Sequence, residues 1–363
     1  MPDVLILSAS IGAGHDLPAE RLGAALAARG VRAEVVDGIA ASGPFVPRAL
    51  LSETTFDSEL GNRVFDVQHF LGIRCSPTRR LAGRLLQLLG GPPLAALVAA
   101  RAPDLVVSTY PGVTEPLGRL RRAGRLRVPV AAAITDLACL RMWAHPGVDT
   151  HLVTHPESAA EVRAIAGPGA DVVAVRGFNP VGFDTPPDRA RARRALGLPA
   201  AGGVVLVSGG GWGVGDVEGA VATALETDAV AVLVLCGTNA GLRARMAAAG
   251  DARVRAFGFT DRMPALMAAA DVLVHSTAGL TVLEALVCGC RVISYGWGRG
   301  HVRVNNAAFR RLGLADVAGD RDELRGALAR ALAAPAAPDA SWLALPEAAD
   351  VLLTRFPALQ RTG

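Results

Sequence analysis

Short apolar runs alternate with helix-like stretches along nearly the whole chain, and this alternation limits the possible folds more than any other feature. The runs are rich in Val, Leu, Ile and Ala, and the stretches between them are amphipathic. This rhythm is typical of βα units that build a parallel sheet. We therefore expect strands at residues 4–7, 33–36, 105–108, 128–134, 151–153, 172–175, 204–207, 230–235, 254–256, 272–275 and 291–294.

A Pro- and Gly-rich stretch, GFNPVGFDTPPDR between Arg176 and Arg189, has no hydrophobic periodicity and is typical of a linker. After it the chain restarts with a strand, a glycine loop and a helix, as it began. The 363 residues suffice for two α/β domains. We predict an α/β fold with two Rossmann-like domains whose parallel sheets face an interdomain cleft. Their bounds are 1–180 and 181–335, and a helical segment, 336–363, returns toward the first domain.

Arginine supplies every one of the 37 basic side chains, because the sequence contains no lysine. Walker-A NTPases, pyridoxal enzymes and Schiff-base aldolases each need a lysine amine and are excluded. The arginines are scattered among 33 acidic residues, and aromatic residues make up only 4% of the chain. A nucleic-acid partner is therefore not expected, because it would need a basic stripe with stacking aromatics.

The cysteines and apolar runs bear on the cellular compartment. Cys288 and Cys290 form a C-x-C pair, and no second pair lies at zinc spacing, so we expect free thiols in a reducing cytoplasm. No signal-peptide pattern opens the chain, and no apolar run approaches the roughly 20 residues of a membrane span. Residues 43–93 break the βα rhythm with amphipathic, arginine-bearing stretches. They fit either ordinary packing helices or a basic, apolar lip that touches the inner membrane face or a lipid acceptor.

The first strand is followed by a turn that contains Gly12, Gly14 and His15. A dinucleotide fingerprint would need a third glycine where Leu17 stands, so NAD binding is disfavoured. His15 is expected at the carboxyl edge of the sheet, where a histidine can act as general base on a hydroxyl. A helix-capping role is the alternative. Asp136 follows another apolar strand and could orient His15 or contact the acceptor.

Two further strand–loop–helix segments have features of a phosphate site. Residues 208–215, SGGGWGVG, contain more glycines than a turn requires and can present backbone amides to an anion; a flexible loop is the alternative. Residues 271–285, DVLVHSTAGLTVLEA, lead from a strand into a helix whose N-terminus can hold a diphosphate. Glu284 lies roughly 10 Å along that helix, a spacing that suits a carboxylate on ribose hydroxyls.

No metal site is predicted. His145, His151 and His155 straddle a strand at spacings that match no ligand pattern. The D-x-D at Asp320 and Asp322 opens a late helix and is better interpreted as an N-cap with an acid that matches the helix dipole. We therefore expect no cofactor beyond a donor substrate.

These motifs, in this order, resemble the GT-B glycosyltransferase family that makes monogalactosyl- and glucosyl-diacylglycerol. The lipid-linked muramyl-peptide GlcNAc transferases are its cousins. The resemblance rests on the 12–15 turn, the TD…W-x-H-P-G-V-D segment at 135–149, the glycine loop, CGTN at 236–239, GF at 258–259, AGLTVLEAL at 278–286 and NNA at 305–307.

The resemblance implies a metal-independent, inverting transfer of a sugar from a UDP-sugar to a hydroxyl acceptor, a diacylglycerol-type lipid or another apolar molecule. It places uracil near the Phe259 backbone, ribose at Glu284 and the sugar at Asn305 or Asn306. The remaining implied substrate contacts, mostly to the diphosphate, are Gly12, Gly14, Ser208, Gly210, Gly211, Gly237, Thr238, Ala278, Gly279, Leu280 and Thr281. His15 and Asp136 are the catalytic candidates. A UDP-sugar epimerase, a non-catalytic nucleotide-sugar-binding regulator and a soluble acceptor are the alternatives.

Overall fold

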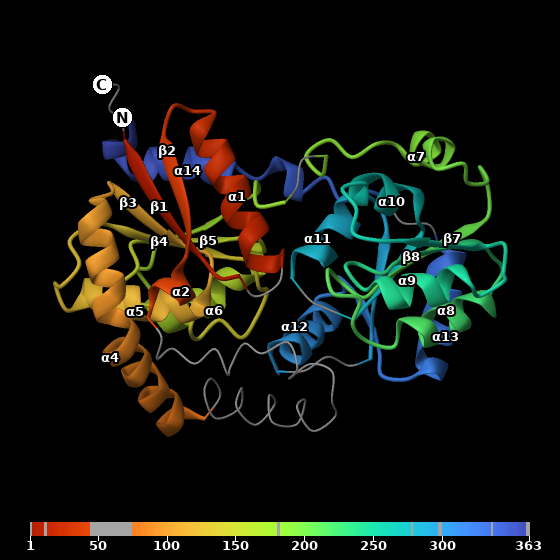
Figure 1. Cartoon of the computed structure of the whole chain (residues 1–363), viewed down its shortest axis with the longest axis horizontal. Coiled ribbons are helices and arrows are strands. Elements are labelled where there is room, and N and C mark those ends of the chain that lie inside the picture. Colours follow the sequence, from red (N-terminus) through yellow and green to blue (C-terminus); the bar gives the residue numbers. More distant parts are fainter. Residues whose placement is uncertain are drawn as a thin grey trace. The chain divides into compact units, whose positions relative to one another are not determined.

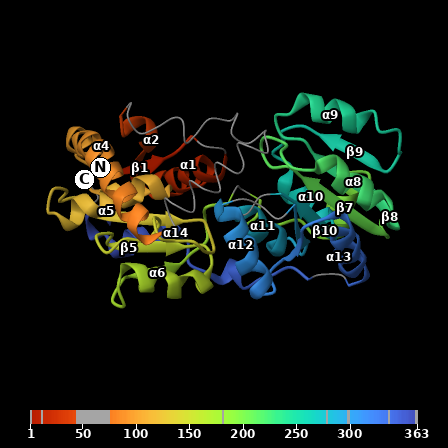
Figure 2. The same cartoon turned by 90° about the horizontal axis from the view of Figure 1, so that it is seen from below.

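The structure is a computed structural model and describes residues 2–10, 13–43, 75–179, 182–276, 279–296, 300–334 and 337–360. The chain divides into two compact units. Unit 1 comprises Met1–Pro180 with Leu345–Gly363, and unit 2 comprises Val181–Ala344. Each unit is a six-stranded sheet flanked by helices (Figure 1, Figure 2). This is the α/β fold with two Rossmann-like units that the sequence predicted, and every predicted strand is present.

The sheet of unit 1 is parallel throughout, with the order β2-β1-β3-β4-β5-β6. The chain first steps from β1 to β2 and then returns to the other side of β1 with β3, so the topology reverses between β1 and β3. Its strands are β1 (Asp3–Ser8), β2 (Arg32–Asp37), β3 (Leu105–Ser108), β4 (Val130–Ile134), β5 (Thr150–Val153) and β6 (Val172–Ala174).

Helices cover both faces of this sheet, and the central strands β3, β4 and β5 are fully buried, as the continuous apolar runs predicted. The helices are α1 (Ala13–Ala27), α2 (Gly38–Ala41), α4 (Ser76–Arg101), α5 (Pro111–Arg122), α6 (Ala159–Ala166) and α14 (Ala348–Arg355). Short 3₁₀ turns lie at Pro156–Ser158 and Pro357–Gln360.

The C-terminal segment belongs to unit 1, and backbone pairing with ion pairs holds it there. The Arg176 N–H donates to Pro346 O at 3.0 Å, and the Ala348 N–H donates to Arg176 O at 2.9 Å. Glu347 forms ion pairs with Arg29 and Arg176. Unit 2 extends past the predicted end at 335 to Ala344.

The sheet of unit 2 has the order β12-β11-β10-β7-β8-β9, again parallel throughout, and its topology reverses between β7 and β10. Its strands are β7 (Gly203–Ser208), β8 (Ala229–Leu235), β9 (Val254–Phe257), β10 (Val272–His275), β11 (Arg291–Tyr295) and β12 (Asp316–Ala318). The short edge strand β12 was not predicted from the sequence, because DVA gives too little apolar signal.

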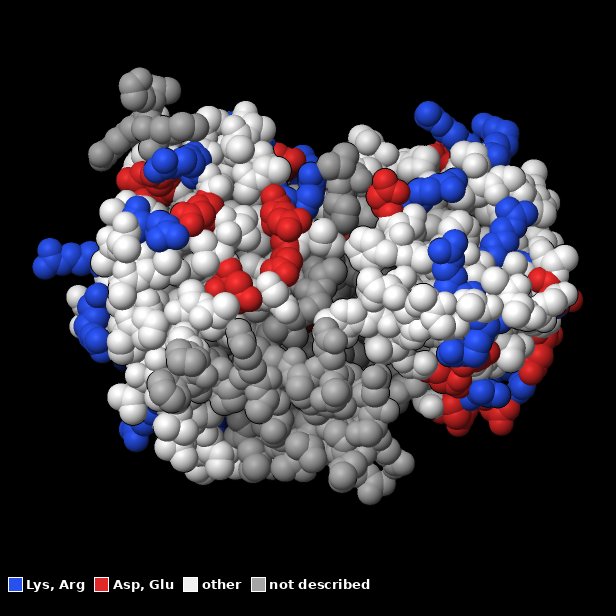
Figure 3. Space-filling view, viewed as in Figure 1, with Lys and Arg blue, Asp and Glu red and all other residues white. Residues whose placement is uncertain are grey.

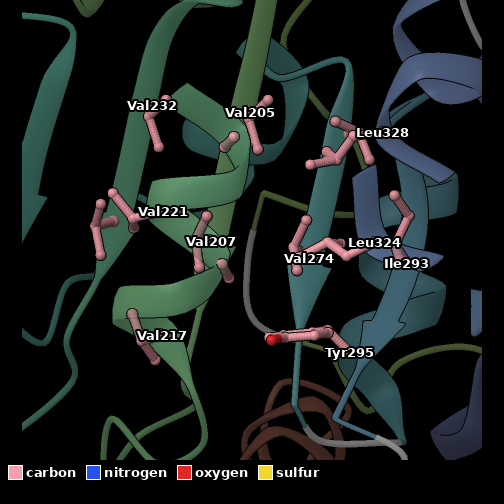
Figure 4. Close-up of a cluster of buried hydrophobic side chains, with 14 of the residues drawn as sticks. Val205, Val207, Val217, Val221, Val232, Val274, Ile293, Tyr295, Leu324 and Leu328 are labelled. Carbon is pink, nitrogen blue, oxygen red and sulfur yellow. The ribbon is translucent and has the colours of Figure 1, made fainter. Parts of the chain in front are cut away.

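The helices of unit 2 divide between the two faces of its sheet. One core combines Val205, Val207, Val274 and Ile293 of the strands with side chains of α8, α9 and α13 (Figure 4). The opposite face contacts α10 and α11. The helices are α7 (Arg189–Ala195), α8 (Val217–Leu225), α9 (Ala240–Ala247), α10 (Met263–Ala269), α11 (Leu280–Val287), α12 (Gly300–Arg311) and α13 (Arg321–Ala333), with a 3₁₀ turn at Trp342–Ala344.

Asp271, at the start of β10, ties α7 to the sheet. Its carboxylate pairs with Arg189 and, at 2.7 Å, with the buried Arg193, and it accepts from the Val204 N–H at 2.8 Å. Because the Arg193 side chain is buried, removal of Asp271 would leave an uncompensated charge inside the unit.

α4 corrects one expectation from the sequence. No membrane-length run was expected, yet Pro77–Arg101 forms one helix that is long and apolar enough to cross a membrane by length and composition. Only 28% of its apolar window is buried. Residues 44–74 of the predicted lip lie outside the described residues.

Three histidines give this fold a defined pH sensitivity. Burial lowers the pKa values of His145, His155 and His275 to about 4 each. Below their ordinary pKa of about 6.5, these histidines are therefore protonated in the unfolded chain but stay neutral in the folded chain. Stability is complete above pH 6.5 and falls as the pH drops toward 4, by up to about 1.4 kcal/mol per pH unit for each histidine.

We predict that the free energy of unfolding of unit 2 becomes smaller as the pH is lowered, and that H275Q makes this loss smaller. Denaturant titrations at pH 7.5, 6.0 and 5.0 measure it. An equal decline in H275Q and in the wild type would contradict the assignment to His275.

Candidate functional site

Each sheet presents its candidate residues where its strand order reverses, at the carboxyl ends of the strands. Open α/β sheets bind their ligands at this position, because the loops from the two neighbouring strands diverge there. In unit 1 these loops follow β1 and β3 and lead to His15 and Thr109. In unit 2 they follow β7 and β10 and lead to the glycine loop and to Gly279.

His15 lies half-buried in the first turn of α1 and contacts the end of β3. Its Nδ1 lies 3.0 Å from Thr109 O, and the Thr109 hydroxyl donates to His15 O at 3.2 Å. A carbonyl only accepts, so Nδ1 carries the proton of the neutral ring and Nε2 is the basic nitrogen. The contact with Thr109 thus sets the tautomer that a general base requires.

Two aromatic rings fix the plane of the His15 imidazole. Tyr110 packs edge-on with ring centroids 4.9 Å apart, and Trp143 lies at 5.8 Å. The Trp143 Nε1–H donates to Asp136 Oδ2 at 2.9 Å. Asp136 is therefore connected to His15 through Trp143.

His145 and His151 of unit 1 have structural partners. The backbone N–H of His145 donates to His151 Nε2 at 3.3 Å, and the ring atom His145 Nδ1 accepts from the backbone N–H of Gly147 at 2.9 Å. A side chain on Gly118 of α5 would meet the His145 ring at 2.3 Å. The H-P-G segment thus packs closely on α5. Among the described residues no His, Cys, Asp or Glu group could hold a metal ion.

Close packing against the glycine loop after β7 explains the glycine at position 237. A Cβ on Gly237, where φ is 56°, would stand 2.2 Å from Gly211 O. The Thr238 N–H and hydroxyl also donate to that oxygen, at 2.9 and 3.2 Å. Gly211 itself is exposed, has no positive φ, and a Cβ on it would meet no described atom within 4 Å. Packing among the described residues therefore leaves the glycine at 211 unexplained.

The helices at this edge differ in whether a side chain accepts hydrogen bonds from the backbone N–H groups of their first turn. Asp216 caps α8 and accepts from the Gly219 N–H at 2.9 Å. Asn239 caps α9 in the same way. α11 begins after Gly279, which has a φ of 97°, and no side chain of the described residues caps it. An anion is therefore better accommodated at α11 than at α8, where the Asp216 carboxylate already occupies the helix end.

The remaining predicted donor residues are distributed over unit 2. Glu284 is buried on α11, Asn305 and Asn306 are fully buried on α12, and Phe259 is 68% exposed beyond β9. Gly210, Leu280 and Thr281 are partly exposed, and Ser208 is buried and accepts from the Gly210 N–H at 3.2 Å. Gly14 lies in α1, and a Cβ there would meet no described atom within 4 Å. Gly12 and Ala278 lie outside the described residues.

Sequence reasoning missed Thr109, Tyr110 and Asp216. Thr109 and Tyr110 directly follow β3, so their place after an apolar strand was the available signal. Trp143 was noted only as part of a motif. Asp320 accepts from the N–H groups of Asp322 and Glu323, so the predicted N-cap is confirmed.

Two family models match the chain, roughly one in each unit. The model of monogalactosyldiacylglycerol (MGDG) synthase matches residues 20–178, and that of glycosyl transferases group 1 matches residues 214–333.

Curated relatives are similar to the chain at low identity. A processive diacylglycerol beta-glucosyltransferase of Bacillus subtilis (strain 168) is 27% identical over 65% of this chain and 62% of its own length. The protein with that description from Bacillus pumilus is 24% identical over 88% of this chain and 84% of its own length. The match to the first of these relatives thus spans less than two thirds of it.

Solved structures share the fold. The Streptomyces sp. SF2575 glycosyltransferase SsfS6 with thymidine diphosphate matches with a TM-score of 0.61 and 18% identity over 98% of this chain and 99% of that chain. Acinetobacter baumannii MurG matches with a TM-score of 0.59 and 15% identity over the same shares. The chain therefore has the two-domain GT-B fold and is a glycosyltransferase homologue that resembles the monogalactosyldiacylglycerol synthase and processive diacylglycerol glucosyltransferase family.

Proposed function

We propose that the protein is an inverting, metal-independent hexosyltransferase that moves a sugar from a UDP-sugar to the hydroxyl of a diacylglycerol-type or other apolar acceptor. The observation that carries this proposal is the His15 tautomer. A histidine at the switch point of unit 1, with Nδ1 on a carbonyl, has Nε2 as its basic nitrogen, and a basic ring nitrogen is what removal of a hydroxyl proton requires. The resemblance to diacylglycerol glucosyltransferases supports the acceptor class.

The reaction is a single displacement. His15 Nε2 removes the proton of the acceptor hydroxyl as its oxygen attacks the anomeric carbon. The bond from that carbon to the β-phosphate oxygen breaks, and UDP departs with the electron pair. The configuration inverts because attack and departure occur on opposite faces of the sugar. Asp136 holds Trp143, and Trp143 holds the imidazole plane.

Unit 2 supplies the donor side. The N-terminus of α11 stabilises negative charge on departing UDP through its N–H groups and dipole. Glu284, on the same helix, is assigned to the ribose hydroxyls by the resemblance. No metal ion is invoked, because these backbone groups stabilise the leaving group.

We expect the purified protein to transfer sugar from one of UDP-glucose, UDP-galactose, UDP-GlcNAc or UDP-glucuronate to diacylglycerol, and to do so in EDTA. H15A should reduce kcat by about 10²- to 10⁴-fold, the usual contribution of a general base. Product analysis by mass spectrometry and NMR of the anomeric proton would report transfer and inversion. The proposal fails if none of these donors binds at millimolar concentration. Unchanged turnover in H15A would instead assign the role of general base to Asp136, or would favour the alternative of a non-catalytic nucleotide-sugar-binding regulator.

A pair of glycine variants separates binding from folding in the glycine loop. G211A adds a methyl group in open space and should leave the melting temperature within a few degrees, while it weakens UDP binding if the diphosphate approaches this backbone. G237A places a methyl group against Gly211 O at a positive φ and should lower the melting temperature strongly. Thermal unfolding and calorimetric titration with UDP measure both. Full UDP affinity in G211A would remove Gly211 from the donor site.

α4 supports a peripheral place at the inner membrane face. Its exposed leucines, Leu81, Leu85, Leu88 and Leu89, are spaced to share one helix face and are 40% to 71% exposed. Exposed Arg80 and Arg84 flank this face. The opposite face packs on α5, so closely that a Cβ on Gly83 would contact Glu115 and Arg119. On the surface seen in Figure 3, arginines and carboxylates are otherwise interspersed. An apolar stripe flanked by arginines suits an anionic lipid surface, with the helix lying in the interface plane.

We predict that the protein co-sediments with vesicles that contain phosphatidylglycerol, more weakly with neutral phosphatidylcholine, and less as salt rises. The double variant L85S/L88S should lose most of this binding. L312S, at a leucine of unit 2 that is 39% exposed, is the matched control and should bind normally. Equal binding by L85S/L88S and the wild type would refute the role of α4. Loss of a dimer in L85S/L88S, seen by ultracentrifugation without lipid, would assign the stripe to a second copy.

A further inference from the structure

Three polar side chains stand in a row at the carboxyl end of the unit 2 sheet. The register pairs His275 of β10 with Ser208 of β7 on one side and with Ser294 of β11 on the other. Paired residues of neighbouring parallel strands lie about 5 Å apart and point to the same face. This row therefore forms one continuous polar strip at the point where the strand order of the sheet reverses.

The strip points away from the main apolar core of unit 2. The residues that alternate with it, Val207, Val274 and Tyr295, belong to the core under α8, α9 and α13 (Figure 4). Because successive side chains of a strand point to opposite faces, Ser208, His275 and Ser294 face the side that α10 and α11 cover. This is the side of α11, whose N-terminus no side chain of the described residues caps.

Several of these polar groups have no hydrogen-bond partner. His275 is 1% exposed, and neither ring nitrogen has a partner among the described residues. The same is true of Ser294 Oγ and of both amide atoms of Asn306, which is fully buried on α12. Each buried polar group without a partner costs about 1–3 kcal/mol, so native proteins rarely leave such groups together. A ligand that supplies the missing partners would account for them.

The chemistry of these groups defines that ligand. Burial lowers the pKa of His275 to about 4, so the ring is neutral at physiological pH. A neutral imidazole, a serine hydroxyl and a carboxamide each both donate and accept hydrogen bonds, and none carries charge. Such a set matches the hydroxyl groups of a sugar better than a phosphate, which needs donors or positive charge.

We propose that His275 and Ser294 bind the hexose of the donor and contribute to the choice of sugar, while the N-terminus of α11 takes the diphosphate. This inference rests on the proposed function and deepens it, because the resemblance assigns neither residue to the site. Asn306, whose amide is also unpartnered, is already assigned to the sugar by the resemblance.

Calorimetric titration with UDP and with the UDP-hexose that the wild type binds most tightly tests this assignment. UDP lacks the hexose, so S294A and H275L should leave its Kd within about twofold and raise the Kd of the UDP-hexose about tenfold, the effect of one lost hydrogen bond. H275Q keeps a donor and an acceptor and should recover part of the affinity. T223V is the matched control: Thr223 is buried on α8, bonded to Gly219 O at 2.9 Å, and both Kd values should be unchanged.

Thermal unfolding of S294A separates a binding role from a structural one. If Ser294 serves the ligand, removal of its unpartnered hydroxyl leaves the melting temperature of the ligand-free protein unchanged or higher. A lower melting temperature together with unchanged UDP-hexose affinity would assign Ser294 to the fold. Equal losses for UDP and UDP-hexose, or no loss for either, would overturn the inference while the proposed function stands. A wild type that binds none of the four donors would overturn both.

Discussion

The parallel direction of all strands within each sheet is the constraint on which both candidate sites depend. Parallel strands bring all their carboxyl ends to one edge, and the helices that follow them begin there. Residues far apart in sequence are thereby collected at one edge of each sheet. His15 meets Thr109 across 94 positions for this reason, and His275 meets Ser208 through the register of β10 and β7. The chain reversal in each sheet then opens the space in which a ligand can lie.

The two sites contrast in electrostatics. In unit 1, the imidazole of His15 is held by a carbonyl and two aromatic rings, and Asp136 is connected to it through Trp143. This arrangement fixes the tautomer and the orientation of His15. In unit 2, the Asp216 carboxylate caps α8, whereas no side chain of the described residues caps α11.

The sequence predicted the scaffold better than the sites. Apolar runs identified the strands because buried parallel strands need continuous hydrophobic residues, and only β12, three residues long, escaped. The 208–215 loop was predicted as a phosphate cradle, yet its Gly213 serves close backbone packing, because a Cβ there would stand 2.5 Å from Cys236 O. That packing involves a turn that is distant in sequence, so no local pattern could reveal it. Trp143 likewise acquires its link between Asp136 and His15 only when the segments that follow β1 and β4 come together.

The polar strip shows why a buried site is hard to infer from sequence. In DVLVHSTAG, His275 ends an apolar strand and is most simply interpreted as the first loop residue. Only the register reveals that it lies between Ser208 and Ser294, and only burial reveals that its nitrogens lack partners. An apolar residue at 275 would fit the neighbouring strands and would avoid the desolvation cost, so stability alone favours its replacement. A neutral, unpaired imidazole at the ligand-binding edge of the sheet is therefore better explained by binding than by folding.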